Sequence, residues 1–127
     1  MKGELASLQV FETPLLKSEQ LSKIANCTVF VKNESFHPGG SIKYRLAKHI
    51  VQKALEEKFD RISVFWMGNT AKSIALLANQ AGIETTIIAQ KNPNPKLKKE
   101  LSEIATIAEG IDLENEFLTQ EKMIQIA

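Results

Sequence analysis

Lys43 is the residue of this chain best placed for covalent chemistry, because of the residues that precede it. It lies in the stretch "FHPGGSIKYR", two residues after a Gly39-Gly40-Ser41 turn that opens an apolar helix. A helix start presents unpaired backbone N–H groups and the positive end of the helix dipole. Among apolar side chains, desolvation and the dipole would both favour the neutral amine of this lysine. A neutral amine is a nucleophile that can form an imine with an aldehyde.

The helix that carries Lys43 is expected from about residue 41 to residue 58. At about 100° per residue, Lys43 falls near the middle of its apolar side. That side is made up of Ile42, Leu46, Ala47, Ile50, Val51, Ala54 and Leu55. The alternative is that the aliphatic stem of Lys43 lets its ammonium reach solvent from the first turn of the helix. The pattern alone leaves both environments open.

A second turn with similar properties follows later in the chain. Gly68, Asn69 and Thr70 come directly after an apolar run and precede an apolar helix. The start of that helix could also bind an anion. Alternatively, the three residues only form a turn, with Thr70 capping the helix.

Around these turns the hydrophobic pattern is that of an α/β domain. The expected strands are 27–32, 61–67 and 85–90, and the expected helices are 18–25, 41–58, 71–81 and 96–108. Gly82 is expected to end the third helix. Short connections between strands and helices predict a doubly wound, three-layer parallel sheet, and ligands of such sheets bind beyond the carboxyl ends of the strands.

Length and charge limit the functional classes. The 127 residues suit a single domain, with residues 1–26 as a candidate N-terminal arm and 111–127 as a candidate C-terminal packing helix. The 16 Lys and Arg against 15 Asp and Glu give no net field toward nucleic acid or a membrane surface. No apolar run is long enough for a signal sequence or a membrane span, so a cytoplasmic location is expected. The single cysteine, Cys27, lacks the spacing of a zinc site, and no metal is expected.

Three motifs carry a resemblance to a known enzyme family. They are "TPLL" at residues 13–16, "FHPGGSIKYR" at 36–45 and "MGNTA" at 67–71. Their order and spacing resemble the start of pyridoxal-phosphate enzymes of the tryptophan-synthase-β type (fold type II), which include cysteine synthases and threonine synthases. The likeness runs from about Thr13 to Leu101. It implies the N-terminal part of that fold and a pyridoxal-phosphate-dependent β-elimination or β-replacement on a small amino acid.

The resemblance also implies roles for single residues. Lys43 would form the internal Schiff base with pyridoxal 5'-phosphate and later move the α-proton of the substrate. Asn69 would hydrogen-bond the phenolic oxygen of the cofactor. Gly68 and Thr70, together with Asn69, would bind the substrate carboxylate.

The chain differs from the family pattern beside both turns. Trp66 and Met67 stand where small hydroxyl residues are usual, and are expected to narrow the site. Tyr44 replaces the usual acidic residue after the lysine, and His37 replaces a common asparagine.

The phosphate-binding loop of the family is not found in this sequence. That loop is rich in glycine and lies downstream of Ala127 in the family, whereas Gly110 is the last glycine here. A second subunit, either a copy of the chain in a homo-oligomer or a different partner, is therefore expected to supply it.

Three functions stay open from the sequence. The first is an enzyme of this family, or its lysine-bearing part, acting on a small amino acid. The second is a catalytically inactive, shortened domain that binds a partner protein or a small ligand. The third is a phosphate-binding module that uses the two helix N-termini, with Lys43 as a point charge.

Overall fold

The structure, a computed structural model, describes residues 12–109. Its elements are β1 (Leu15–Lys17), α1 (Glu19–Ala25), β2 (Phe30–Lys32), the 3-10 turn η2 (Glu34–Phe36), α2 (Lys43–Glu56), β3 (Arg61–Phe65), α3 (Asn69–Ala81), β4 (Glu84–Ile88), α4 (Pro95–Leu101) and β5 (Thr106–Ala108). Within this part of the chain, no helix is long and apolar enough to cross a membrane. The helix predicted at 111–127 and the first residues of the predicted arm lie outside the described residues.

A parallel sheet forms the centre of the fold, with its described strands in the order β3-β4-β5. Val64 pairs with Ile87, and Ile87 with Ile107, so the three side chains form a row on one face. The connecting helices α3 and α4 pack on this face, because their buried residues share a core cluster with the row. Two right-handed crossovers in the same direction place both helices on one side. The predicted parallel α/β fold is confirmed.

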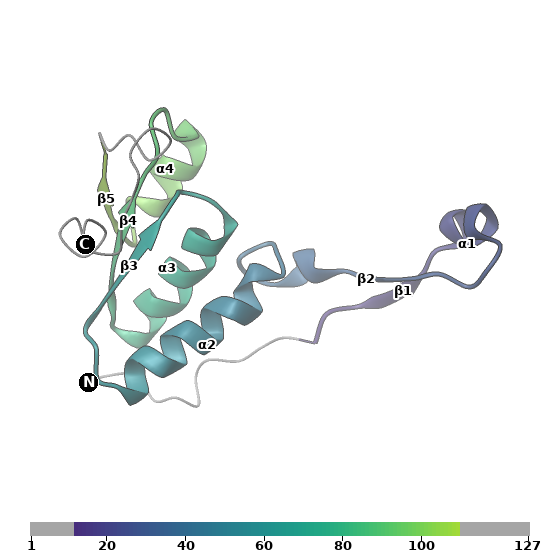
Figure 1. Cartoon of the computed structure of the whole chain (residues 1–127), viewed down its shortest axis with the longest axis horizontal. Helices are drawn as coiled ribbons and strands as arrows, with labels where there is room; N and C mark the ends of the chain where they lie inside the picture. Colours follow the sequence, from purple (N-terminus) through teal and green to yellow (C-terminus); the bar gives the residue numbers. More distant parts are fainter. Residues whose placement is uncertain (1–11, 110–127) are drawn as a thin grey trace, which may run out of the picture.

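Helices α2 and α3 lie side by side and begin at the same end of the molecule (Figure 1). Their contact is built largely from small and branched side chains. The buried members are Tyr44, Ala47, Val51 and Ala54 on α2 and Ile74, Leu77, Ala78 and Ala81 on α3. Alanines let two helix backbones approach closely, and each fully buried Val, Ile or Leu side chain stabilises the fold by about 1.5–3 kcal/mol. This packing fixes the two helix N-termini relative to each other.

Strands β1 and β2, with α1 between them, form an arm that projects from the start of α2, away from the parallel sheet (Figure 1). The two strands pair antiparallel with each other, Leu16 opposite Val31. The sequence predicts helix α1 and, at residues 27–32, strand β2. It assigns this strand to the parallel sheet, and that assignment is wrong. Short apolar runs indicate a strand without indicating its partner.

The helix predicted at 96–108 is also wrong in its second half. Helix α4 ends at Leu101, and Thr106–Ala108 forms β5, parallel to β4. Leu97, Leu101 and Ile104 all pack into the same core cluster. Their spacing in the sequence therefore resembles that of a continuous helix, although the helix ends at Leu101.

Candidate functional site

The two turns singled out in the sequence are neighbours in the structure. Gly39 lies against α3 so closely that a Cβ atom at this position would be 2.5 Å from the Oγ atom of Ser73. The Ser73 hydroxyl donates a hydrogen bond of 2.8 Å to the backbone carbonyl of Asn69. The loop before α2 therefore rests on the first turns of α3, close to the turn that contains Asn69.

Lys43 is the first residue of α2, and its side chain is exposed. Its backbone N–H donates to the Oγ atom of Ser41 over 3.3 Å. Of the two environments that the helical pattern leaves open for this amine, the described residues show the solvent-exposed one. The buried side of α2 is centred on Tyr44 and Val51, whereas Ile42 on the other half of the apolar arc is exposed. The amine of Lys43 is thus open to a ligand.

The second turn leads straight into α3. Gly68 occupies the N-cap position in an extended conformation, and no side chain caps the helix. Thr70 lies inside the helix, so the alternative in which it serves as the N-cap is wrong. Asn69 is exposed. The first N–H groups of α3 consequently remain available to an anion, as at other uncapped helix starts.

Trp66 and Met67, which separate β3 from this turn, have different environments. Met67 is buried in the core with Ala71 and Ile87, so the prediction that it narrows the site is wrong. Trp66 is partly exposed and has a φ of 68°, a left-handed conformation that costs an L-residue roughly 1–2 kcal/mol. Its N–H donates to the carbonyl of Ile88 over 2.9 Å, which helps to hold this conformation. Backbone strain of this kind is found preferentially at functional sites.

A polar cluster beside the loop was not predicted from the sequence. One carboxylate oxygen of Glu34 accepts a hydrogen bond from the hydroxyl of Thr13 (2.6 Å). The other oxygen accepts from Nε of Arg45 (2.7 Å) and also lies 3.1 Å from Nε2 of His37. The hydrogen bonds from Arg45 and then Thr13 lower the pKa of Glu34 to about 2. Thr13 and Arg45 lie within two of the sequence motifs quoted above, and Glu34 lies between these motifs. An acidic residue at that place was the one sequence feature that could have indicated the cluster.

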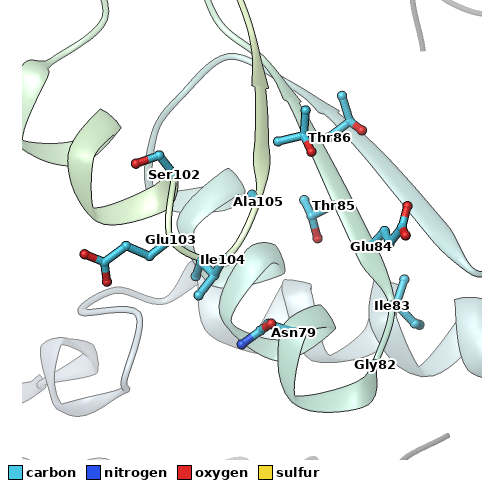
Figure 2. Close-up of a pocket in the computed structure, with 11 residues that line it drawn as sticks. Asn79, Gly82, Ile83, Glu84, Thr85, Thr86, Ser102, Glu103, Ile104 and Ala105 are labelled. Atoms are coloured by element: carbon cyan, nitrogen blue, oxygen red, sulfur yellow. The ribbon is translucent and has the colours of Figure 1, made fainter.

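A pocket of about 480 Å³ lies at the amino ends of β4 and β5. Thr85 and Asn79 are among its lining residues, and the Thr85 hydroxyl is buried without a described partner. Figure 2 shows the carboxylates of Glu84 and Glu103 pointing away from Thr85. The pocket sits at the C-terminal end of α3, about 20 Å of helix from the start of α3. It therefore does not belong to the site formed by the two turns.

The sequence profile described as pyridoxal-phosphate dependent enzyme matches residues 6–117 of the chain. This is most of its length and includes both turns. The chain therefore belongs to the family of pyridoxal-phosphate-dependent enzymes, as its motifs predict.

Individual relatives narrow the comparison. The L-serine dehydratase/L-threonine deaminase of Bos taurus is 30% identical over 105 residues, which cover 80% of this chain and 32% of that protein. The threonine synthase of Methanosarcina acetivorans is 34% identical over 89 residues, 69% of this chain and 22% of that protein. The crystal structure of a fungal L-serine ammonia-lyase from Rhizomucor miehei has a TM-score of 0.70 at 26% identity, covering 80% of this chain and 33% of that one. The chain spans no more than about a third of the length of these proteins.

Members of this family bind pyridoxal phosphate, and the described residues include groups whose chemistry suits the ring of that cofactor. An exposed amine at Lys43, an exposed amide at Asn69 and an uncapped helix start lie at one end of the molecule. The phosphate group has no equivalent fit. Between Thr70 and Glu109 the single glycine is Gly82, at the far end of α3, so the described chain contains no glycine-rich phosphate loop.

Proposed function

We propose that this chain supplies the lysine-bearing part of a pyridoxal-phosphate-dependent site for β-elimination or β-replacement on a small amino acid. The observation that supports this most directly is the close contact of Gly39 with Ser73. It brings the loop before Lys43 onto the helix that begins with Asn69. The amine and the amide are thereby presented from two elements whose packing is fixed.

Each residue has a distinct task in this proposal. When bound, the cofactor supplies an electron sink that makes the α-proton of an amino acid acidic. Lys43 holds the cofactor through its Nζ atom and afterwards moves the α-proton as a general base. Asn69 would donate a hydrogen bond from its side-chain amide to the phenolic oxygen of the cofactor. The N–H groups at the start of α3 and the Thr70 hydroxyl bind the carboxylate of the substrate.

The names of the relatives support a substrate with a β-hydroxyl group or a derivative of one. They are proteins described as acting on serine and threonine or as synthesising threonine. A β-oxygen is a leaving group that departs once charge develops at the α-carbon. We therefore assign the chain a small β-hydroxy amino acid, without choosing between elimination and replacement.

In this proposal a second polypeptide packs against the arm. The arm supports such a partner. Both of its strands are exposed throughout, and α1 has no buried residue. An isolated two-stranded ribbon is marginally stable in water, and exposed apolar patches commonly mark interfaces.

The test is covalent capture of the cofactor by Lys43. Protein mixed with pyridoxal phosphate is reduced with borohydride, and the modified lysines are located by peptide mass spectrometry. We expect an adduct at Lys43 that is absent from Lys43→Ala and unchanged in Lys53→Ala, an exposed lysine on the same helix. Adducts spread evenly over the surface lysines, or none, would refute the enzymatic role of the isolated chain.

A second candidate is a catalytically inactive domain that binds a partner. The bulky side chain of Trp66 before the Gly68–Thr70 turn favours it, since the family resemblance leads us to expect small hydroxyl residues there. This candidate predicts association through the arm without any adduct at Lys43. The capture experiment and a measurement of association therefore separate the two functions.

A further inference from the structure

The carboxylate of Glu34 has all of its acceptor positions occupied. One oxygen accepts from Thr13 Oγ1 over 2.6 Å and from Arg45 Nη2 over 3.0 Å. The other accepts from Arg45 Nε over 2.7 Å and lies 3.1 Å from His37 Nε2. Four donors match the four lone-pair sites of an ionised carboxylate, and the two-point contact with Arg45 fixes its orientation. An uncharged amide could not reproduce this pattern.

These contacts join three separate segments of the chain. Thr13 precedes the arm, Glu34 and His37 belong to the segment between β2 and α2, and Arg45 lies two residues after Lys43. Thr13 and His37 are buried, at 5% and 2% exposure. The cluster therefore fastens the base of the arm to the first turn of α2.

A continuous set of contacts leads from Glu34 to the second turn. His37 stacks on Tyr44, with ring centroids 5.2 Å apart, and its carbonyl accepts from the N–H of Gly40 over 2.7 Å. Gly39, between them, contacts Ser73, and the hydroxyl of Ser73 is bound to the carbonyl of Asn69.

A shift of this loop cannot stay local. A Cβ atom added to Gly39 would lie only 2.5 Å from Oγ of Ser73. Displacement of the loop toward α3 would therefore push against Ser73 and the start of this helix. Displacement away from α3 would open a gap in a packed region. The packing of Gly39 on Ser73 therefore couples the position of the loop to that of the start of α3.

The charge of Glu34 determines the tautomer of His37. Because a carboxylate only accepts, Nε2 of His37 must carry the proton that faces it. Its Nδ1 atom is buried without a partner among the described residues. Without the carboxylate, either tautomer would be allowed and the ring could turn.

We propose that Glu34 is a positioning residue, which holds the Pro38–Ser41 loop against α3 and so fixes Lys43 relative to Asn69. Its significance for catalysis rests on the proposed function. It touches neither reacting atom and acts through His37 and Arg45.

The test compares two Arg–Glu pairs of this chain. Glu34→Gln removes the carboxylate of the cluster, and Glu84→Gln removes that of the exposed pair between Arg61 and Glu84, at the start of β3 and β4. Hydrogen–deuterium exchange is followed in peptides covering 37–44, 68–73 and 74–81. We expect Glu34→Gln to speed exchange roughly tenfold in the first two peptides but not in the third, and Glu84→Gln to affect none of them.

A role in stability alone would give a different result. Exchange would then rise to the same degree in all three peptides, or in 37–44 only, and either outcome would overturn the proposal. If Glu34→Gln does not fold, Arg45→Lys keeps the charge but loses the two-point contact, and the same peptides decide.

Adduct formation with pyridoxal phosphate is then measured on the same variants. We expect roughly tenfold less borohydride-trapped adduct at Lys43 in Glu34→Gln than in the parent or Glu84→Gln. Equal adduct in all three proteins would overturn the positioning role. A parent protein that forms no adduct would instead refute the proposed function, while the exchange data would still decide whether Glu34 positions the loop.

Discussion

Gly39 shows at the residue scale how tightly the two turns fit together. Gly39→Ala places a Cβ atom 2.5 Å from Ser73 Oγ and 3.4 Å from Tyr44, while the backbone at this position suits any residue. We expect a loss of about 1–3 kcal/mol in the free energy of unfolding, because the loop must move away from α3. Urea unfolding measures the loss.

The close contact also predicts a rescue. Adding Ser73→Ala to Gly39→Ala removes the clashing oxygen and should recover most of the loss. Gly40→Ala is the matched control, since Gly40 has a φ of 70° with open space around it. Its cost, about 1 kcal/mol, arises from the backbone, so Ser73→Ala should not change it. Equal rescue of both glycine variants would show that the contact is not the cause.

Glu34 predicts a specific dependence of stability on pH. Hydrogen bonds from Arg45 and Thr13 hold its pKa at about 2, below the ordinary value of 4.5. Between these values the unfolded chain binds the proton more readily, so the contribution of Glu34 is complete above about pH 4.5 and disappears toward pH 2. In urea unfolding from pH 6 to pH 2, the parent and Glu34→Gln should converge. A difference that stays constant over this range would contradict the assignment.

Sequence reasoning located the turns but left the surroundings of Lys43 open. Residue types place a lysine after Gly39-Gly40-Ser41, and glycines mark both turns. The buried face of α2 depends on which side α3 covers, and a pattern in one helix cannot contain that information. Tyr44, which the sequence analysis did not include in the apolar side of this helix, is 2% exposed. The cluster around Glu34 was missed because its members are brought together only by the fold.

At the scale of elements, α4 offers a clear test of local stabilisation. Oδ1 of Asn94 accepts from the N–H groups of Lys96 (3.0 Å) and Leu97 (3.2 Å), and Pro95 begins the helix. Asn94→Ala should lower the free energy of unfolding by about 1 kcal/mol, whereas Asn94→Asp, which retains the acceptor, should be nearly neutral. Thermal unfolding of both variants checks this, and equal losses would exclude capping as the cause.

Strand β5, which follows α4, shows which kind of element the sequence pattern does not predict. Helices α2 and α3 were predicted from their helical periodicity, and α3 ends at Gly82, where φ is 70°. Strands β3 and β4 were predicted as short, continuous apolar runs. Strand β5 has three residues, and its conformation depends on pairing with Thr86–Ile88. Long-range pairing of this kind overrides the local pattern. The partner of β2 was missed for the same reason.

At the scale of the whole molecule, the arm and the body differ in how they are stabilised. The body has two core clusters, whereas the arm gains its order from one strand pair and its fastening at Glu34. Large apolar side chains of the arm remain exposed. They are Leu15, Leu16, Leu21, Ile24, Phe30 and Val31. A partner that covered these side chains would remove their apolar surface from water without disturbing the core of the body. This favours association through the arm.

The last prediction follows from this division. Replacing Leu16, Ile24 and Phe30 together by serine removes side chains that are 52%, 83% and 56% exposed, so the core loses nothing. The melting temperature should change by less than about 4 °C. Association of two copies should weaken roughly a hundredfold or more, because each large apolar side chain buried at an interface contributes about 1.5–3 kcal/mol. Sedimentation velocity over a range of concentrations measures this, with Leu46→Ser and Phe59→Ser as controls for exposed apolar residues of the body. If these controls weaken association equally, the interface lies elsewhere. If the parent stays monomeric at every concentration, the partner that covers the arm is not a second copy of this chain.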